Sequence, residues 1–369
     1  MTALEITSIA ISLIGGLAIF LYGMKVMTES LTLVAGRRMK LLLSKLTRNR
    51  FTAALAGAMV TAIIQSSSVT TVLIVSFITA GLMSFTQSIG MILGANVGTT
   101  ITAQIIAFKV TKAAMLMIAF GFFTELLASN RRVKYLATMM LGLGLLFLGM
   151  NLMSQATEPL KSLPSFIALM RDIQNPLAGI LIGATFTALV QSSSATTGII
   201  IILASQGFIS LEAGIALVMG ANIGTCVTAI LSAIGKPREA VQAAVVHVVF
   251  NVLGVLLWVW FIPQLAQLVQ EISPSSPQLQ GAARLAADAP RQIANAHTLF
   301  NVVAALVFLP FLAPFARLCE RLVPDRPLDE SGGITPRFLD DEVISIPAFA
   351  LERARFEIAR MGGYVEDML

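Results

Sequence analysis

Long stretches of the chain contain no charged side chain. The 58 residues from Phe51 to Phe108 include no Asp, Glu, Lys, Arg or His, and neither do the 39 residues from Ile173 to Leu211. A water-soluble fold has no place for such segments, whereas a bilayer needs about 20 apolar residues for each helix that crosses it. The pattern therefore predicts an all-α polytopic membrane protein. Ile6 to Met24 is expected to be a retained first membrane span.

Two of the apolar segments are too short to cross a membrane. Phe51 to Ile64 would make about 21 Å of helix against a hydrocarbon core of ~30 Å, and Val69 to Met83 is similarly short. Between them lies the sequence Gln-Ser-Ser-Ser at 65–68. We therefore expect a re-entrant helical hairpin over residues 51–83, with two half-helices that meet near the middle of the membrane.

The next apolar segment, residues 86–108, is long enough to span but carries Gly-Ala-Asn-Val-Gly at 94–98. Glycine permits backbone conformations that other residues resist, so we expect an interrupted transmembrane helix here. Backbone groups freed by such a break are available as ligands.

The whole unit occurs twice. Residues 57–107 align without gaps on residues 183–233, at a constant offset of 126, with 22 of 51 positions identical. The second copy predicts a re-entrant hairpin over 175–207 and a broken helix over 211–234. Gly16 and Gly23 of the first span match Gly142 and Gly149 at the same offset. Such a period indicates two copies of one structural unit.

Basic residues predict the orientation of each copy. The connector after the first span carries six basic side chains and no acidic one: Arg37, Arg38, Lys40, Lys45, Arg48 and Arg50. The matching connector of the second copy has two basic and two acidic residues. The first connector is therefore expected in the cytoplasm and the second outside, which makes the copies inverted-topology repeats. The N-terminus is then outside and the C-terminus cytoplasmic; Lys109 and Lys112 do not fit this scheme.

Composition excludes several classes of protein. Hydrophobic residues make up 56% of the chain and charged residues 12%, with a mean hydropathy of +0.83. The net charge of +5 lies in short clusters between apolar runs, so no nucleic-acid surface is expected. Two distant cysteines indicate neither a disulfide framework nor a metal site. The glycine-rich, lysine-containing loop of nucleotide-driven pumps is absent.

The repeated motifs offer hydroxyls, carboxamides and half-helix ends, but no charged side chain. Sodium binds several neutral oxygens, and an oxyanion binds hydroxyls and the amides at a helix N-terminus. A lone serine in a membrane helix usually forms a hydrogen bond to a neighbouring helix and binds no ligand. Here the same serine cluster occurs twice, at 66–68 and 192–194, each beside a glycine-rich motif. This duplication favours a pocket for an anion and co-bound cations between two hairpin tips.

At these motifs the sequence resembles the type II sodium–phosphate cotransporters and their bacterial relatives. The resemblance extends over roughly residues 7–320. It implies sodium-coupled symport of inorganic phosphate by alternating access, in a protein that is not an enzyme. The implied phosphate-binding residues are Ser66, Ser67, Ser68, Ser192, Ser193, Ser194, Asn96, Asn222, Thr99 and Thr225. The implied sodium-binding residues are Gln65, Thr70, Thr71, Thr100, Gln191, Thr196 and Thr197. Cys226 stands where the first copy has Thr100, so one hydroxyl is missing there.

The predicted division of the chain has four parts. Residues 1–130 and 131–262 are the two transmembrane repeats, residues 263–321 an outside loop and the last transmembrane helix, and residues 322–369 a cytoplasmic linker and a helical region. The last helix resembles the start of the PhoU-like bundles of some bacterial members. The expected location is the lipid bilayer of a bacterial inner membrane, with sodium ions co-transported and a homodimer left open.

Other interpretations remain open at this stage. The transported oxyanion could differ from phosphate, or the protein could sense phosphate without moving it. An intramembrane serine hydrolase would use one serine cluster with His247, but duplication of the whole tip argues against a single nucleophile. His247 and His297 each begin a His-x-x-Phe-Asn pattern. They are candidates for a pH-responsive gate, although hydrogen bonding between helices is the commoner role.

Overall fold

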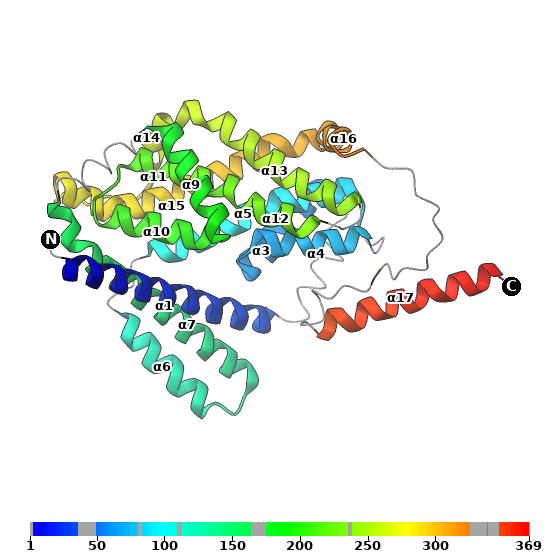
Figure 1. The fold of residues 1–369 in the computed structure, drawn as a ribbon, viewed down its shortest axis with the longest axis horizontal. Helices are drawn as coiled ribbons and strands as arrows, with labels where there is room; N and C mark the ends of the chain where they lie inside the picture. Colours follow the sequence, from blue (N-terminus) through cyan, green and yellow to red (C-terminus); the bar gives the residue numbers. More distant parts are fainter. Residues whose placement is uncertain are drawn as a thin grey trace.

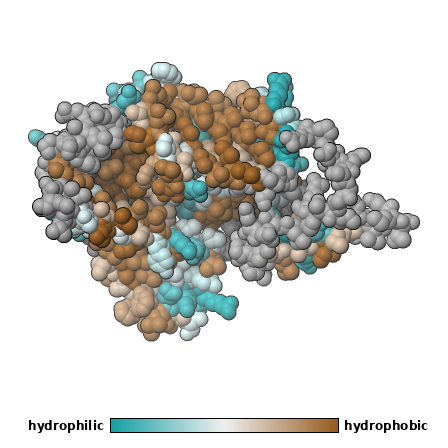
Figure 2. Space-filling model, viewed as in Figure 1, coloured by the Kyte–Doolittle hydropathy of each residue, from teal (hydrophilic) through white to brown (hydrophobic). Residues whose placement is uncertain are grey.

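The computed structural model is all-helical. It describes residues 3–35, 49–79, 83–108, 113–163, 175–234, 238–324, 338 and 347–368, and no strand occurs in these ranges. Six of the described helical stretches are long and apolar enough to cross a membrane. Brown, hydrophobic atoms cover much of the face shown in Figure 2. Large side chains such as Leu116, Leu189 and Trp260 are more than two thirds exposed, as expected of a surface that faces lipid.

The helices follow the two repeated units in order. The first unit contains α1 (Ala3–Ala35), α3 (Arg50–Ile64), α4 (Ser67–Thr79), α5 (Phe85–Ala107) and α6 (Ala114–Leu127). The second contains α7 (Arg131–Thr157), the 3-10 turn η2 (Glu158–Ser162), α9 (Pro176–Val190), α10 (Ser193–Ser205), α11 (Leu211–Gly224) and α12 (Cys226–Ala233). Each predicted hairpin segment is thus a pair of short helices, α3–α4 and α9–α10.

Helices α1 and α7 lie side by side along one edge of the molecule (Figure 1). Their glycines make the contact: a Cβ on Gly16 would meet the Gly149 oxygen at 3.1 Å, and one on Gly23 would meet the Gly142 oxygen at 2.7 Å. The earlier glycine of α1 contacts the later glycine of α7, and the later glycine of α1 contacts the earlier one of α7. The two helices therefore run antiparallel. Because Gly16 matches Gly142 and Gly23 matches Gly149, the two contacts are equivalent and relate α1 to α7 by a local two-fold.

Helix α5 corrects the prediction of a broken helix at residues 86–108. It runs without interruption from Phe85 to Ala107. Its glycines instead let it approach α3 closely: a Cβ on Gly94 would lie 1.8 Å from the Ala54 oxygen, and one on Gly98 2.3 Å from the Ala58 oxygen. The missing side chains therefore serve close helix packing rather than a change of backbone direction.

The second copy repeats this packing but contains a short break. A Cβ on Gly220 would lie 2.1 Å from the Ile180 oxygen, and one on Gly224 2.3 Å from the Ala184 oxygen. Here α11 ends at Gly224 and α12 begins at Cys226. Thr225 between them keeps helical angles, with φ −62 and ψ −21, so the break is a small local irregularity.

A further duplicated element completes the bundle. Helix α13 (Arg238–Trp258) bends through η3 (Val259–Phe261) into α14 (Ile262–Ile272), and α15 (Gly281–Phe308) bends through η4 (Leu309–Phe311) into α16 (Leu312–Leu322). The predicted outside loop is consequently short: residues 263–272 are helical, and α15 begins again at Gly281. Phe250, Phe308 and Phe315 pack edge to face between these elements.

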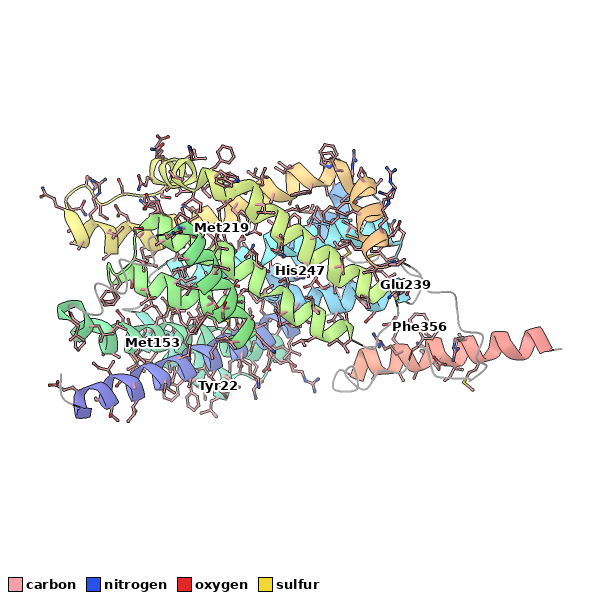
Figure 3. The ribbon with its side chains drawn as sticks, turned by 45° about the horizontal axis from the view of Figure 1, so that its top comes forward. Tyr22, Met153, Met219, Glu239, His247 and Phe356 are labelled. Carbon is pink, nitrogen blue, oxygen red and sulfur yellow. The ribbon has the colours of Figure 1, made fainter. Side chains whose placement is uncertain are left out.

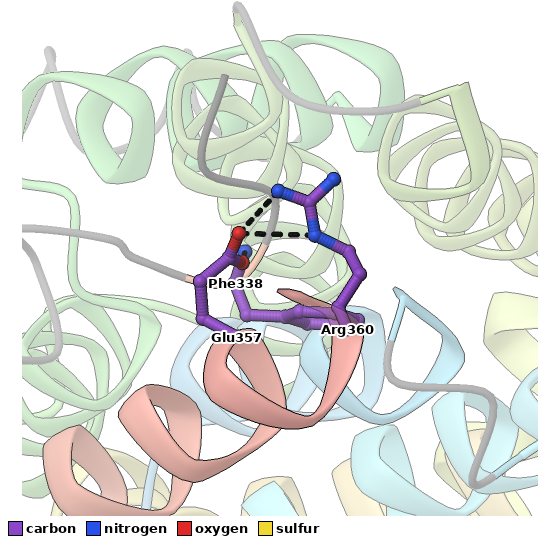
Figure 4. A network of polar contacts seen from close by, with 3 residues as sticks. All are labelled: Phe338, Glu357 and Arg360. Atoms are coloured by element: carbon purple, nitrogen blue, oxygen red, sulfur yellow. Dashed lines mark hydrogen bonds and ion pairs between the residues drawn. The ribbon is translucent and has the colours of Figure 1, made fainter. Parts of the chain in front are cut away.

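The chain ends with α17 (Pro347–Met368), which extends away from the bundle (Figure 1). Glu357 is buried, accepts a 2.7 Å hydrogen bond from the Phe338 backbone amide and pairs with Arg360 (Figure 4). Arg353 donates to the Ser76 hydroxyl, which joins α17 to α4. A PhoU-like bundle stays a prediction, because α17 is the one helix described after residue 324.

Several residues used to predict orientation lie outside the described ranges: residues 37–48, 109–112, 171–172 and 236.

Candidate functional site

Each hairpin turn begins with a glutamine in an unusual backbone conformation. Gln65 has φ 58 and Gln191 has φ 55, and among the described residues they are the only non-glycine positions with a positive φ. Each residue ends its helix. The backbone amide of Gln65 donates to the Thr61 carbonyl, and the backbone amide of Gln191 donates to the Thr187 carbonyl. Such conformations cost energy and concentrate at functional sites, where the surrounding structure enforces them.

The first serine of each cluster serves as a helix cap. The Ser66 hydroxyl accepts from the Val69 amide at 3.3 Å, and the Ser192 hydroxyl accepts from the Ala195 amide at 3.2 Å. These two predicted phosphate-binding residues therefore hold the N-termini of α4 and α10 in place. The amides of the next residues stay at the open end of each helix, where a helix N-terminus favours an anion.

Buried threonine pairs join the two halves of each hairpin. The Thr61 hydroxyl donates to the Thr70 hydroxyl at 2.9 Å, and the Thr187 hydroxyl donates to the Thr196 hydroxyl at 2.9 Å. Thr70 and Thr196, predicted to bind sodium, also donate to the carbonyls of Ser66 and Ser192. Their hydroxyls are thus engaged within the hairpins. Thr61 and Thr187 were not predicted, although both lie inside the duplicated segment.

The motif asparagines contact the C-terminal helices. Asn96 donates to Asn251 on α13 at 2.9 Å, and Asn222 donates to Asn301 on α15 at 2.9 Å. Asn251 and Asn301 each donate in turn to the backbone oxygen of the histidine four residues earlier. Sequence reasoning missed these two partners as site residues, but the His-x-x-Phe-Asn pattern was the signal that could have identified them.

The two histidines are buried next to the motif residues; Figure 3 shows His247 inside the bundle on α13. His247 Nδ1 lies 3.4 Å from the Thr71 hydroxyl, and His297 Nε2 lies 3.1 Å from Asn222 Oδ1. The other ring nitrogen of each, His247 Nε2 and His297 Nδ1, is buried and has no hydrogen-bond partner among the described residues. Both rings therefore contact residues of the predicted phosphate and sodium sets.

A group of hydroxyls near the tips makes no hydrogen bond within the described residues. These are the side chains of Ser67, Ser193, Ser194, Thr197 and Thr225, all less than 9% exposed. These residues are buried as a whole, but their hydroxyl oxygens are not among the fully buried unpartnered atoms of the described residues, so each oxygen keeps some accessible surface. These groups are consequently the best candidates to contact a bound ion.

Two other predicted residues, Thr99 and Thr100, form hydrogen bonds within their own helix. Thr99 donates to the Ala95 oxygen at 3.1 Å and Thr100 to the Val97 oxygen at 2.8 Å. Cys226, at the position matching Thr100, lies 3.5 Å from the Asn222 oxygen. Thr99 and Thr100 are thus engaged within α5, and Cys226 also lies 3.7 Å from the backbone oxygen of His247 on α13.

The structure joins each tip to the other unit rather than to the other tip. Helix α4 packs against α12 and α13, and α10 packs against α5 and α15. The Ser68 hydroxyl is hydrogen-bonded to the Thr228 hydroxyl of α12, whereas no hydrogen bond links residues 66–68 to 192–194 in the described part of the chain. The described residues also contain no cluster of His, Cys, Asp or Glu suited to a transition metal. The site is thus polar and uncharged.

Comparisons with known proteins agree with this picture. The model of the Na+/Pi-cotransporter family matches residues 19–155 and 164–273. Uncharacterized protein YqeW of Bacillus subtilis is 35% identical over 273 residues, which cover 73% of this chain and 88% of that protein. Putative inorganic phosphate export protein YjbB of Salmonella typhimurium is 30% identical over 361 residues, which cover 97% of this chain and 63% of that protein.

A third relative matches only a short part of the chain. Sodium-dependent phosphate transport protein 2C of Rattus norvegicus is 47% identical over 83 residues, or 21% of this chain and 14% of that protein. No solved structure shows a significant match.

The family model covers well over half of the chain and includes both serine clusters. The chain therefore belongs to the Na+/Pi-cotransporter family.

Proposed function

We propose that the protein carries inorganic phosphate across the membrane together with sodium, by alternating access to a site at the two hairpin tips. The observation that carries the proposal is the group of hydroxyls at the N-termini of α4 and α10 that belong to buried residues and have no hydrogen-bond partner among the described residues. Helix N-termini and hydroxyl donors together bind an oxyanion without any charged side chain. The same uncharged oxygens suit sodium, a hard cation.

Ser67, Ser193 and Ser194 are the proposed phosphate ligands, because their hydroxyls are free and lie in the first turn of a helix. Thr197 and the Gln191 carboxamide are the proposed sodium ligands. Thr71, like Thr70, donates its hydroxyl to a backbone carbonyl of the hairpin, that of Ser67 at 2.8 Å. Ser66 and Ser192 act as caps, and Thr70 and Thr196 stabilise the hairpins. This division refines the sequence prediction, which gave all of them direct ligand roles.

The proposed mechanism uses two inverted repeats with re-entrant hairpins. The antiparallel contact of α1 with α7 through equivalent glycines supports an inverted relation. The short helices α3, α4, α9 and α10 have 13 to 15 residues, too few to span. Non-helical backbone between them is tolerated in a membrane where protein or a water-filled cavity surrounds it. One unit moving relative to the other would then open the site to each side in turn.

The direction of net transport depends on the gradients that the cell maintains. Relatives named as putative inorganic phosphate export proteins favour export as a second candidate. Relatives named as sodium-dependent favour coupling to sodium. We place the protein in a bacterial inner membrane with its C-terminus in the cytoplasm, on the basis of the charge pattern. A transporter family also favours transport over hydrolysis.

The test is phosphate flux in proteoliposomes that contain the purified chain. Radiolabelled phosphate is supplied under an inward sodium gradient, an outward sodium gradient, or a matched potassium gradient. We expect accumulation above equilibrium only with inward sodium, and accelerated efflux when the sodium gradient is reversed. Equal phosphate flux under the potassium gradient would show that sodium is not the coupling ion.

Two further outcomes distinguish the alternatives. An excess of unlabelled phosphate should abolish uptake, whereas the same excess of sulfate should leave most of it. Equal inhibition by sulfate would indicate a less selective oxyanion carrier. Phosphate binding by folded protein without any flux would indicate a sensor.

A further inference from the structure

Two threonines outside the predicted site contact the first hairpin tip. The Thr102 hydroxyl on α5 donates to Gln65 Oε1 at 2.5 Å. The Thr228 hydroxyl on α12 is hydrogen-bonded to the Ser68 hydroxyl. Thr102 and Thr228 occupy equivalent positions in the two units, at the offset of 126. Both members of an equivalent pair therefore hold the same tip, so the arrangement is asymmetric although the sequence is duplicated.

The second tip lacks both contacts. Gln191, equivalent to Gln65, is exposed, and its side chain makes no hydrogen bond to the described residues. Ser194, equivalent to Ser68, is buried, and its hydroxyl likewise has no partner in the described part of the chain. Gln65, by contrast, is only 5% exposed. The glutamine of one tip is thus enclosed while its counterpart is open.

The histidine contacts show the same asymmetry. His247 lies beside Thr71 of the first tip, whereas the equivalent Thr197 has no side-chain hydrogen bond within the described residues. His297 instead lies beside Asn222. Because α13 and α15 are themselves duplicated, a symmetric molecule would show matching contacts. The differences all concern groups at or near the tips, while the pairs Thr61–Thr70 and Thr187–Thr196 are identical in the two halves.

We propose that Thr102 and Thr228 are positioning residues shared by the two tips, and that they exchange partners during transport. In the state described here they hold the first tip through Gln65 and Ser68. In the opposite state they hold the second tip, Thr102 through Ser194 and Thr228 through Gln191. This proposal rests on the proposed alternating-access function.

The exchange conserves the chemistry of the contacts. Each state contains one glutamine–threonine and one serine–threonine hydrogen bond, formed by equivalent groups. Two such states differ little in free energy, so both can be populated and a bound ion can shift the balance. The partner exchange also explains why each threonine lies on the unit opposite to one of its proposed partners.

The experiment measures the accessibility of the two glutamine positions in the full chain. In a background with Cys226→Ala and Cys319→Ala, either Gln191→Cys or Gln65→Cys is reacted with a water-soluble maleimide in detergent micelles. The cysteine at 191 should react faster. Ser68→Ala removes a contact of the described state only, so it should slow labelling at 191 and speed labelling at 65. Ser194→Ala should do the opposite.

The expected shifts are about fivefold, as for the loss of one hydrogen bond from one of two states. Ser88→Ala is the matched control, because this buried serine bonds within its own helix. In a Thr228→Val background, Ser68→Ala should cause no further change in the labelling rates. In a Thr228→Ser background, which keeps the hydroxyl, Ser68→Ala should still shift them. Gel filtration establishes that each variant is folded.

The proposal is overturned if the two serine variants move the labelling rates in the same direction, or move neither. Phosphate uptake is measured on the parent chain with Cys226→Ala and Cys319→Ala only, because Ser194 and Gln191 are themselves proposed ligands. If the labelling rates do not respond to the serine variants while sodium-dependent uptake is intact, the sharing of the two threonines is rejected and the proposed function stands. Opposite labelling shifts without uptake reject the function and keep the exchange.

Discussion

At the scale of single residues, the hydroxyls near the tips fall into two groups. Ser66, Ser192, Thr70 and Thr196 form hydrogen bonds that shape the hairpins. Ser67, Ser193 and Ser194 have no partner in the described part of the chain. Motif spacing could predict that the serines cluster, because the motif is duplicated. It could not predict which hydroxyl caps a helix, since that depends on where the backbone turns at Gln65 and Gln191.

The threonine pair of the first hairpin gives a direct test of this division. Thr61→Val leaves the buried Thr70 hydroxyl with one partner fewer, so we expect the folded protein to lose about 1 kcal/mol of stability. Thr61→Ser keeps the donor and should lose less. Thermal unfolding in detergent, followed by tryptophan fluorescence, measures the difference. A valine variant as stable as the parent would show that the pair does not hold the hairpin.

At the scale of helices, the glycines of the motif determine packing. We predicted a helix break at Gly94 and Gly98, and this was wrong for α5; the same glycines are equally compatible with the close helix contact that the structure shows. Glycine residues alone cannot separate them, because both roles require the absence of a Cβ. Which of the two roles a glycine has depends on whether another helix packs against it. The second unit has both features, close contacts at Gly220 and Gly224 and a small break at Thr225.

Gly94→Ala should therefore destabilise the fold strongly. Its Cβ would lie 1.8 Å from the Ala54 oxygen, so α3 and α5 would have to separate, at a cost of about 3 kcal/mol or more. The control is Gly15→Ala, where no neighbouring atom lies within 4 Å. We expect the Gly94 variant to aggregate in gel filtration and the Gly15 variant to elute as the parent does. Normal folding of both would refute the packing role.

The contact of α17 with the first hairpin gives another test at this scale. Arg353→Ala removes the hydrogen bond to Ser76 on α4, so α17 should become more susceptible to limited proteolysis. Arg355→Ala, at an exposed position on the same helix, serves as the comparison. Faster cleavage in the first variant alone is the expected result. Equal cleavage of both would mean that Arg353 does not anchor the helix.

At the scale of the whole molecule, the duplication organises the fold. The repeat could be predicted from the offset of 126, and the all-helical membrane architecture from the charge-free segments; the structure confirms the all-helical architecture. The duplication of α13–α14 in α15–α16 was visible only as His-x-x-Phe-Asn. Its meaning required the structure, because Asn251 and Asn301 are distant in sequence from the asparagines that they contact.

The orientation in the membrane stays a prediction that cysteine labelling can test. Ser129→Cys lies between α6 and α7, and Gln278→Cys between α14 and α15; both positions are exposed. A membrane-impermeant maleimide added to intact cells should label position 278 and leave 129 unlabelled until the cells are opened. The native cysteines are buried and should react little. The reverse pattern would invert the proposed topology.

The most direct test of the central claim is sodium-driven phosphate uptake by proteoliposomes that contain Ser67→Ala or Ser193→Ala protein. These serines lie in different units, and both are buried residues whose hydroxyls have no partner among the described residues. Each variant should lose most of its sodium-dependent uptake although it remains folded, while the Ser88→Ala control keeps it. Full sodium-dependent uptake by either serine variant would contradict a site built from both hairpin tips.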